Sequence, residues 1–332
     1  MIPLRLFAWA KMQEEKQAIT LIKNFQMKCQ STYMKRFMKK MFKDTSTIFV
    51  TGGCGFIGIN LVKYLLQKTN SNIIIYDNFS TSNYDYFINL NFFEGNRIKI
   101  IEGDIKDYDS LNQAMSNSDY VINLAAQVGV IESISDPIYD AEINIMGLIN
   151  VLRSACENKI KCLVHASSAA PLGEQIPPLS ETNVPSPLSP YGASKLSSEG
   201  YCSAFSGTFS LNTCVLRFSN VYGRFSFGKT SVASAFIKKM IKNEACIIYG
   251  DGKQTRDFIY VKDICQAIFQ ALKKNLKGYN LFQIGTGIET SVIDFFTSIS
   301  SSMSERGFTV KEPVYLDTRP GEIIRNFCDI SK

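Results

Sequence analysis

The chain has 332 residues, of which 45% are hydrophobic and 20% charged, as in an ordinary globular protein. Its formal charge of +6 comes from residues 1–44, where ten Lys and Arg accompany three acidic residues, so the remainder offers no basic face to nucleic acid. No apolar run reaches the ~18 residues that a membrane-spanning helix requires.

Residues 1–45 form a basic, Met-rich extension that we keep out of the fold prediction. The segment lacks the compact apolar region and the small-residue cleavage site of a signal peptide. A transit peptide stays open, although Lys outnumbers Arg and Ser is scarce. A start at Met41 would place the first predicted strand only a few residues into the chain. We therefore expect residues 1–45 to be a non-native or disordered extension.

From Thr47 onward, short apolar runs alternate with longer amphipathic stretches. The runs that predict strands are Ile48–Thr51, Ile73–Tyr76, Ile98–Ile101, Tyr120–Leu124, Lys161–Ala166 and Thr213–Phe218. The stretches that predict helices between them are Ile59–Lys68, Tyr108–Met115, Tyr139–Glu157 and Tyr191–Phe205. Continuous apolar strands separated by helices indicate a parallel sheet covered on both faces. We predict a doubly wound α/β fold of the Rossmann type, with ligands at the carboxyl ends of the strands.

After residue 218 the alternation loosens. Predicted helices are Ser231–Lys242, Val261–Lys273 and Val292–Ser302, and predicted strands are Ala245–Tyr249, Tyr279–Ile284 and Pro313–Leu316. We predict a dinucleotide-binding domain over residues 46–218, to which segments around residues 255–290 return. A smaller mixed α/β lobe is expected over residues 219–332.

The first predicted strand runs into a glycine-rich turn and then a helix. Gly53, Gly55 and Gly58 satisfy G-x-G-x-x-G, with Gly52 added before them. Such glycines allow the backbone to approach a pyrophosphate, whose charge lies at the helix N-terminus. The second predicted strand ends at Asp77, nineteen residues after Gly58. A carboxylate there accepts hydrogen bonds from ribose hydroxyls and repels a 2′-phosphate, so we predict NAD rather than NADP.

Two further segments are candidates for the cofactor site. Asp104 follows the third predicted strand, where it either reaches the adenine edge or caps the next helix. Leu124, Ala125 and Ala126 follow at the end of the fourth strand, where a passing cofactor requires small residues.

Tyr191 and Lys195 form Y-x-x-x-K in a predicted helix, and residues four apart lie on one helix face. A nearby ammonium and a positive nicotinamide both stabilise a tyrosinate, so we expect the pKa of Tyr191 to fall below its usual value of about 10. Tyr191 would then act as a general base near neutral pH. The preceding strand ends in Ser167 and Ser168. We expect Ser168 to hydrogen-bond the reacting substrate oxygen, with Ser167 as the alternative.

The chain has nine cysteines without a C-x-x-C pair, and it has a single His. We therefore predict no metal site. Scattered cysteines in apolar stretches are typical of small buried side chains in a reduced, cytoplasmic protein. His165 lies inside an apolar strand and is expected to be structural.

The chain resembles the nucleotide-sugar 4-epimerases of the extended short-chain dehydrogenase/reductase family, the NAD-dependent epimerases and dehydratases. The resemblance runs from Thr47 to about Lys332. The segments that carry it are Thr51–Gly58, Asp77–Ser80, Asn123–Gln127, Ser167–Ala169, Tyr191–Lys195, Arg217–Gly223, Gly250–Gly252, Arg256–Phe258 and Arg319–Glu322.

The resemblance implies a set of site residues. Those at NAD are Gly52, Gly55, Phe56, Ile57, Gly58, Asp77, Asn78, Ser80, Asp104, Ile105, Leu124, Ala125, Ala126, Tyr191 and Lys195. The smaller lobe is implied to bind a nucleotide-sugar, with Asn220, Arg256 and Arg319 at its diphosphate, for which an Arg fork is suited. Asn326 falls near a position that limits the room for an N-acetyl group in related epimerases. Its small size admits UDP-N-acetylglucosamine.

The activity implied by the resemblance is inversion of C4 in a UDP-hexose through a 4-keto intermediate, with NAD held throughout. The substrate pair is UDP-glucose and UDP-galactose, or their N-acetylated counterparts. Related dehydratases typically carry Asp-Glu after the serine, where this chain has Ala169 and Ala170. Glucuronate epimerases carry Arg after a Gly-Val pair, where this chain has Ile131, which favours a neutral sugar. A dehydratase, a decarboxylase and a UDP-glucuronate epimerase remain the alternatives.

A non-catalytic NAD-binding protein is the alternative from a different class. Two departures from the family pattern support it. Leu172 stands where the family often has Tyr, and the sequence stops at Lys332, whereas relatives usually continue through a further helix or strand. The resemblance also implies a homodimer, with Ile105–Met115 and Tyr139–Glu157 as candidate interface helices.

Overall fold

The computed structural model describes residues 45–82, 96–226, 228–318 and 323–332, so the predicted extension lies outside it except for its last residue. Its centre is a seven-stranded sheet of the order β11-β6-β5-β4-β1-β2-β3 in which every pair of neighbours is parallel. The strands are β1 (Thr47–Thr51), β2 (Asn72–Asp77), β3 (Ile98–Glu102), β4 (Tyr120–Asn123), β5 (Cys162–Ser168), β6 (Thr213–Phe218) and β11 (Tyr279–Ile284). The predicted doubly wound fold is confirmed.

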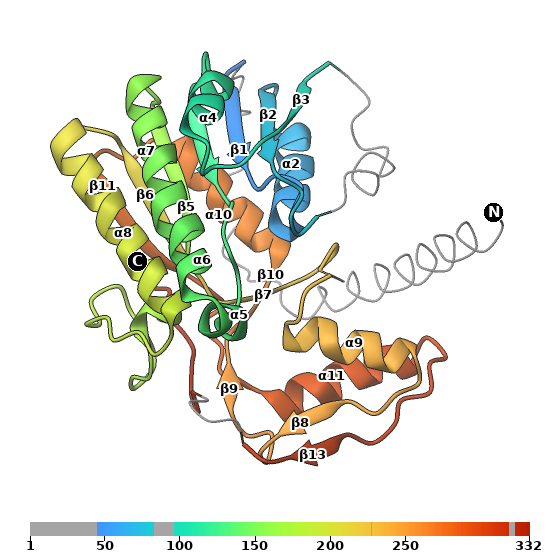
Figure 1. The fold of residues 1–332 in the computed structure, drawn as a ribbon. Coiled ribbons are helices and arrows are strands. Elements are labelled where there is room, and N and C mark those ends of the chain that lie inside the picture. The colour runs from blue at the N-terminus through green and yellow to red at the C-terminus, as the bar shows by residue number, and fades with distance from the viewer. Residues whose placement is uncertain (1–44, 83–95, 227, 319–322) are drawn as a thin grey trace.

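Helices cover both faces of the sheet (Figure 1). One layer contains α2 (Phe56–Lys68) and α10 (Val261–Lys274), and the other contains α4 (Tyr108–Met115), α7 (Leu148–Glu157) and α8 (Pro190–Phe209). Alternate residues of a strand point to opposite faces, so Ile48 and Val50 enter the core under α2, whereas Phe49 enters the core under α7. Both faces of β1 are therefore apolar, which explains its unbroken hydrophobic run.

The predicted helix Tyr139–Glu157 differs from the observed structure. The chain forms α5 (Val130–Ser135), then α6 (Pro137–Ala141), the π-helical segment η2 (Glu142–Gly147) and α7. Asp136 starts α6 by accepting a hydrogen bond from the backbone nitrogen of Tyr139, and Pro137 occupies the first turn. The widened turn of η2 lies beside the cavity described below, as π-bulges often do at functional sites.

The second lobe gathers below the large sheet in Figure 1. It contains α9 (Val232–Ile241), α11 (Val292–Ser304) and the parallel pair β8 (Ile247–Tyr249) and β13 (Val314–Leu316). Two short pairs of strands were not predicted from the sequence. They are β7 (Asn220–Tyr222) with β10 (Phe258–Tyr260), and β9 (Thr255–Arg256) with β12 (Thr290–Ser291).

The region after residue 255 contributes to both parts of the molecule. β11 pairs with β6 at the edge of the central sheet, and α10 packs against α2. Val261, Ile264, Cys265 and Ile268 form the buried stripe of α10 at the spacing of an amphipathic helix. No helix within the described residues is long and apolar enough to cross a membrane.

Candidate active site

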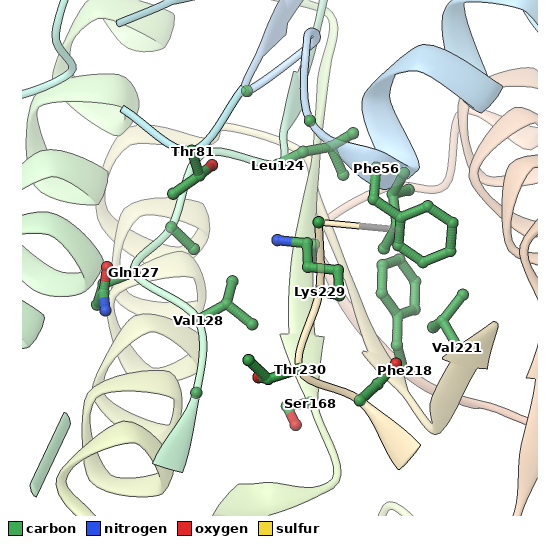
Figure 2. A pocket seen from close by; sticks show the side chains of 18 of the residues that line it. Phe56, Thr81, Leu124, Gln127, Val128, Ser168, Phe218, Val221, Lys229 and Thr230 are labelled. Carbon is green, nitrogen blue, oxygen red and sulfur yellow. The ribbon is translucent and has the colours of Figure 1, made fainter. Parts of the chain in front are cut away.

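A large cavity opens at the carboxyl ends of the central strands. Its volume is about 1820 Å³, above the roughly 300–1,000 Å³ of typical ligand pockets, so it has room for more than one ligand. It includes the point where β1 and β4 lie side by side, at which the strand order reverses and doubly wound proteins bind their ligands. Figure 2 shows part of its wall, to which the second lobe contributes through α9, β8 and β9.

Most residues that were predicted for the site line this cavity. They are Gly52, Gly55, Phe56, Ile57, Gly58, Asp77, Asn78, Ser80, Asp104, Ile105, Leu124, Ala125, Ala126, Ser167, Ser168, Tyr191, Lys195, Asn220 and Arg256. Arg319 lies outside the described residues. Asn326 is buried and is not among the residues that line the cavity. The carbonyl of the next residue, Phe327, accepts a hydrogen bond from the backbone nitrogen of Leu179. The role of Asn326 in limiting the room for an N-acetyl group stays a prediction.

The glycine loop between β1 and α2 is built from close backbone contacts. Gly52 has a φ of +67°, and a Cβ there would stand 2.7 Å from the nitrogen of Ala125. A Cβ on Gly58 would stand 2.5 Å from the carbonyl oxygen of Gly53. Gly55 caps α2 without a side-chain hydrogen bond, and the first turn contains no acidic residue. The backbone N–H groups that begin α2 are therefore free of a side-chain cap and suited to an anion.

Asp77 holds the glycine loop to the end of β2. Its carboxylate accepts hydrogen bonds from the backbone nitrogens of Cys54 and Phe79, both at 2.9 Å, and only 8% of the residue is exposed. Asp104 accepts from Asn78 Nδ2 at 3.1 Å and from the backbone of Lys106. The N-cap of the next helix, α4, is Asp107, so Asp104 is not that cap.

Ser167 and Ser168 point to different environments although they are neighbours in β5. The Ser167 hydroxyl donates to Glu199 Oε1 at 2.6 Å, and Glu199 forms a bidentate ion pair with Arg217 that is almost fully buried. The Ser168 hydroxyl instead lies at the Tyr191 phenol, whose pKa it lowers. Because side chains alternate along a strand, only one of two adjacent serines can face the phenol. The structure places Ser168 there.

The residues of the chain act on the pKa of Tyr191 in opposite directions. Burial raises it to about 12, the hydrogen bond with Ser168 lowers it, and the Asp140 carboxylate raises it. Lys195 lies beside the ring, with its Nζ 5.9 Å from the ring centroid, but donates to the carbonyl of Ala166 at 3.0 Å. Burial lowers the pKa of Lys195 to about 8. Because burial dominates, the residues of the chain by themselves favour the neutral phenol of Tyr191. The expected fall in this pKa, which depends on the positive nicotinamide, stays a prediction.

A buried polar network beneath this pair escaped prediction. Asn144 of η2 donates from Nδ2 to the carbonyl of Gln127, to Asp140 Oδ1 and to Ser194 Oγ, all within 3.1 Å. Its Oδ1 accepts from the backbone of Gln127. The network ties η2 to the loop after β4 and to the helix that carries Tyr191. No spacing in the sequence indicates it, because its members come from three separate segments.

His165 has the structural role that was expected. It is buried in β5, its Nδ1 lies 3.0 Å from Asn123 Nδ2, and its Nε2 lies 2.9 Å from Ser198 Oγ. Burial lowers its pKa well below the usual value. Within the described ranges, no group of three or more His, Cys, Asp or Glu side chains is arranged to hold a metal ion.

The second lobe adds polar residues to the opposite wall. Arg256 donates from Nη1 to the carbonyls of Thr255 and Ile323, at 2.7 and 2.8 Å. Asn220 begins β7, and its backbone donates to the carbonyl of Asp257. Lys229 of the β7–α9 loop also lines the cavity. It was not predicted, because it belongs to no sequence motif.

The comparison with known proteins decides the family. The model of the NAD dependent epimerase/dehydratase family matches residues 48–285. The chain belongs to this family. A Methanocaldococcus jannaschii protein provisionally named UDP-glucose 4-epimerase is 40% identical over 291 residues, covering 86% of this chain and 90% of that protein.

Solved structures agree with this membership. UDP-N-acetylglucosamine 4-epimerase from Methanobrevibacter ruminantium, in complex with UDP-N-acetylmuramic acid, is 33% identical with a TM-score of 0.78, covering 87% of this chain and 90% of that one. UDP-glucuronic acid 4-epimerase from Bacillus cereus, in complex with UDP-glucuronic acid and NAD, is 31% identical with a TM-score of 0.77, covering 86% and 90%. The predicted resemblance and the NAD cofactor are confirmed at the level of the family.

The cavity fits NAD at one end. The glycine loop leaves no room for side chains between β1 and β4, and the uncapped start of α2 offers N–H donors to a diphosphate. Asp77 stands at the end of β2, where a ribose hydroxyl would meet a carboxylate. The geometry of these residues supports the assignment of this end of the cavity to the cofactor.

Proposed function

We propose that the chain is a UDP-hexose 4-epimerase, which interconverts UDP-glucose and UDP-galactose or their N-acetylated counterparts. The observation that carries the proposal is the meeting of Ser168, Tyr191 and Lys195 at the carboxyl end of β5, in the same cavity as the glycine loop. A reacting hydroxyl beside these side chains would lie between the cofactor site and the second lobe. The family membership and the 4-epimerase names of similar proteins add support.

In this proposal Tyr191 accepts the proton of the sugar 4-hydroxyl and later returns it. Ser168 donates a hydrogen bond to the same sugar oxygen and holds it near the phenol. NAD, when bound, supplies a positively charged ring that accepts the C4 hydride and gives it back, so no net oxidation occurs. Lys195 keeps a positive charge beside the ring of Tyr191 and supports its ionised form.

The raised pKa of the Tyr191 phenol bears on this mechanism. A phenol with a pKa of about 12 holds its proton at neutral pH, so Tyr191 is protonated in the protein alone. Positive charge brought into the cavity lowers that pKa and converts Tyr191 into a base. Proton transfer is then coupled to the presence of the cofactor.

Two related activities are less well supported. A dehydratase would need a carboxyl group next to the serine, and Ala169 and Ala170 follow Ser168. A glucuronate epimerase would need a cation at the sugar, and Ile131 stands where related enzymes carry Arg. Glu132, the next residue, places an acid in the cavity instead.

We also propose a homodimer. Ile134, Ile138 and Met146 are more than half exposed on the segment from α5 to η2 and do not line the cavity. A second copy of the chain would bury such a patch. Sedimentation of the purified protein should give a dimer, and a monomer at micromolar concentration would contradict this part of the proposal.

The experiment that tests the function offers UDP-glucose, UDP-N-acetylglucosamine and UDP-glucuronate separately to the purified protein with NAD. Products are separated by chromatography, and the C4 configuration is read by NMR. One neutral sugar should give its C4 epimer, and Tyr191→Phe should lower the rate about a thousandfold because the proton acceptor is lost. If NAD binds and none of the sugars changes, the epimerase proposal is wrong.

A further inference from the structure

We propose that Lys229, a residue of the second lobe, contacts the diphosphate of NAD and thereby joins that lobe to the cofactor. The inference rests on the proposed function only in requiring that NAD and a nucleotide-sugar share the cavity. It assigns to the β7–α9 loop a role toward the cofactor in addition to any role toward the sugar.

The charges of the cavity wall are the first argument. Within the described residues, the cavity is lined by three cations, Lys195, Lys229 and Arg256, and by the carboxylates of Asp77, Asp104 and Glu132. NAD and a UDP-sugar each bring a negatively charged diphosphate into this space. Lys195 is held under Tyr191 by the carbonyl of Ala166, and Arg256 is held in the second lobe by two carbonyls. Of these three cations, Lys229 is the one whose side chain is not held by a carbonyl.

The direction of Lys229 is the second argument. In Figure 2 its amine points into the cavity, toward the side that carries Thr81 and Gln127. In this view Lys229 is drawn between Ser168, at the end of β5, and the segment with Phe56 and Leu124, and all four residues line the same cavity. The uncapped N-terminus of α2 and Lys229 thus both belong to the wall of the cavity into which NAD would bring its diphosphate.

The anchoring of the loop is the third argument. The backbone nitrogen of Lys229 donates to the carbonyl of Ser226 at 2.8 Å, and Lys238 Nζ donates to the carbonyl of Lys229 at 3.0 Å. Ser234 of α9 also donates to the carbonyl of Ser226, at 2.6 Å. The main chain of Lys229 is therefore held on both sides by α9, which limits the space that its amine can reach.

The electrostatics of Lys229 agree with an anionic ligand. Burial lowers the pKa of the amine, and the carboxylate of Glu132 raises it. Among the hydrogen bonds of the described residues, none uses the Lys229 amine. The carboxylate of Glu132 therefore acts on this amine through its charge and accepts no hydrogen bond from it. A phosphate oxygen would add both a negative charge and an acceptor, and charge-assisted bonds of this kind are among the strongest.

The test measures how fast the holoenzyme releases its cofactor. Enzyme loaded with NADH is mixed with excess ADP-ribose, and the loss of bound NADH fluorescence gives the release rate. Lys229→Ala should release NADH about tenfold faster than the natural protein, the effect of one lost charge-assisted contact. Lys229→Arg should stay close to the natural rate, and added salt should narrow the difference because it screens the charge.

Two controls make the result specific. Lys273→Ala removes an exposed charge at the end of α10, away from the cavity wall, and should leave the release rate unchanged. Lys229→Gln keeps most of the side-chain length and serves if the alanine variant folds poorly; it too should release NADH faster. An unchanged release rate in both Lys229→Ala and Lys229→Gln overturns the proposal.

A second measurement separates the cofactor from the substrate. Calorimetric titration of the same variants with UDP, UDP-glucose and UDP-glucuronate should give unchanged affinities. If UDP binds more weakly while NADH release stays normal, Lys229 belongs to the substrate diphosphate and the proposal is wrong. If only UDP-glucuronate binds more weakly, Lys229 recognises a sugar carboxylate, with the same consequence. None of these readouts depends on epimerisation, so a failed epimerase assay would leave this test intact.

Discussion

At the end of the cavity formed by β1, β2 and β4, the chain presents its backbone, whereas at the end formed by β5 and α8 it presents side chains. The first end is made by glycines whose neighbours leave no space for a Cβ. The second is made by Ser168, Tyr191 and Lys195, below which lies the buried pair of Glu199 and Arg217. Substitutions that add atoms should therefore reduce stability and NAD binding at the backbone end, and substitutions that remove atoms should reduce activity at the side-chain end.

The largest effect is expected at the backbone end, from one added carbon. Gly58→Ala would force a Cβ to 2.5 Å from the carbonyl oxygen of Gly53, and neither backbone can move without disturbing the loop. We expect a loss of about 3 kcal/mol in the free energy of unfolding, typical of severe overpacking, together with loss of co-purifying NAD. Denaturant unfolding and the NAD content of the purified protein measure the two.

Gly200→Ala is the matched control for this substitution. Gly200 lies inside α8, and a Cβ there would meet nothing within 4 Å. Because Ala is the better helix former, the change should stabilise the protein by about 0.5–1 kcal/mol. Equal destabilisation by both substitutions would show that the backbone contacts at Gly58 are not what matters.

The next effect separates the two adjacent serines at the side-chain end. Ser168→Ala should lower kcat about a hundredfold, since it removes a hydrogen-bond donor from the reacting oxygen and from Tyr191. Ser167→Ala should leave kcat nearly unchanged and cost about 1 kcal/mol of stability, because its hydroxyl serves Glu199. Steady-state kinetics and thermal unfolding of both variants test the comparison. A larger kinetic loss from Ser167→Ala would reverse the assignment.

The last comparison concerns pH and the buried ammonium of Lys195. Its pKa is about 8 in the folded chain and about 10.5 when unfolded, so between these values the unfolded chain binds more protons. Folding stability should therefore rise with pH in this window, by up to about 1.4 kcal/mol per pH unit from this group. Denaturant unfolding at several pH values should show this slope in the natural protein. Lys195→Met should lack it, and equal slopes would contradict the assignment.

Several elements could be predicted because their signals are local. The bounds of β6, β11 and α4 agree with the expected ranges. The glycine loop was predictable because G-x-G-x-x-G after an apolar strand is a short local pattern, although Gly52 meets Ala125 only in the folded chain. The interruption of the predicted helix Tyr139–Glu157 was not, because a π-helical turn depends on the partners that Asn144 meets on α8, far along the chain.

Local residue pattern was enough for the doubly wound class, the NAD end of the cavity and the pairing of Tyr191 with Lys195. Strand alternation, helical period and glycine spacing are all properties of short segments, and they survive without knowledge of the rest of the chain. Tertiary structure decided that Ser168 rather than Ser167 faces Tyr191, that burial raises the pKa of Tyr191, and that Lys229 lines the cavity. Each of these depends on desolvation or on contacts between distant segments, and neither is encoded in spacing along the sequence.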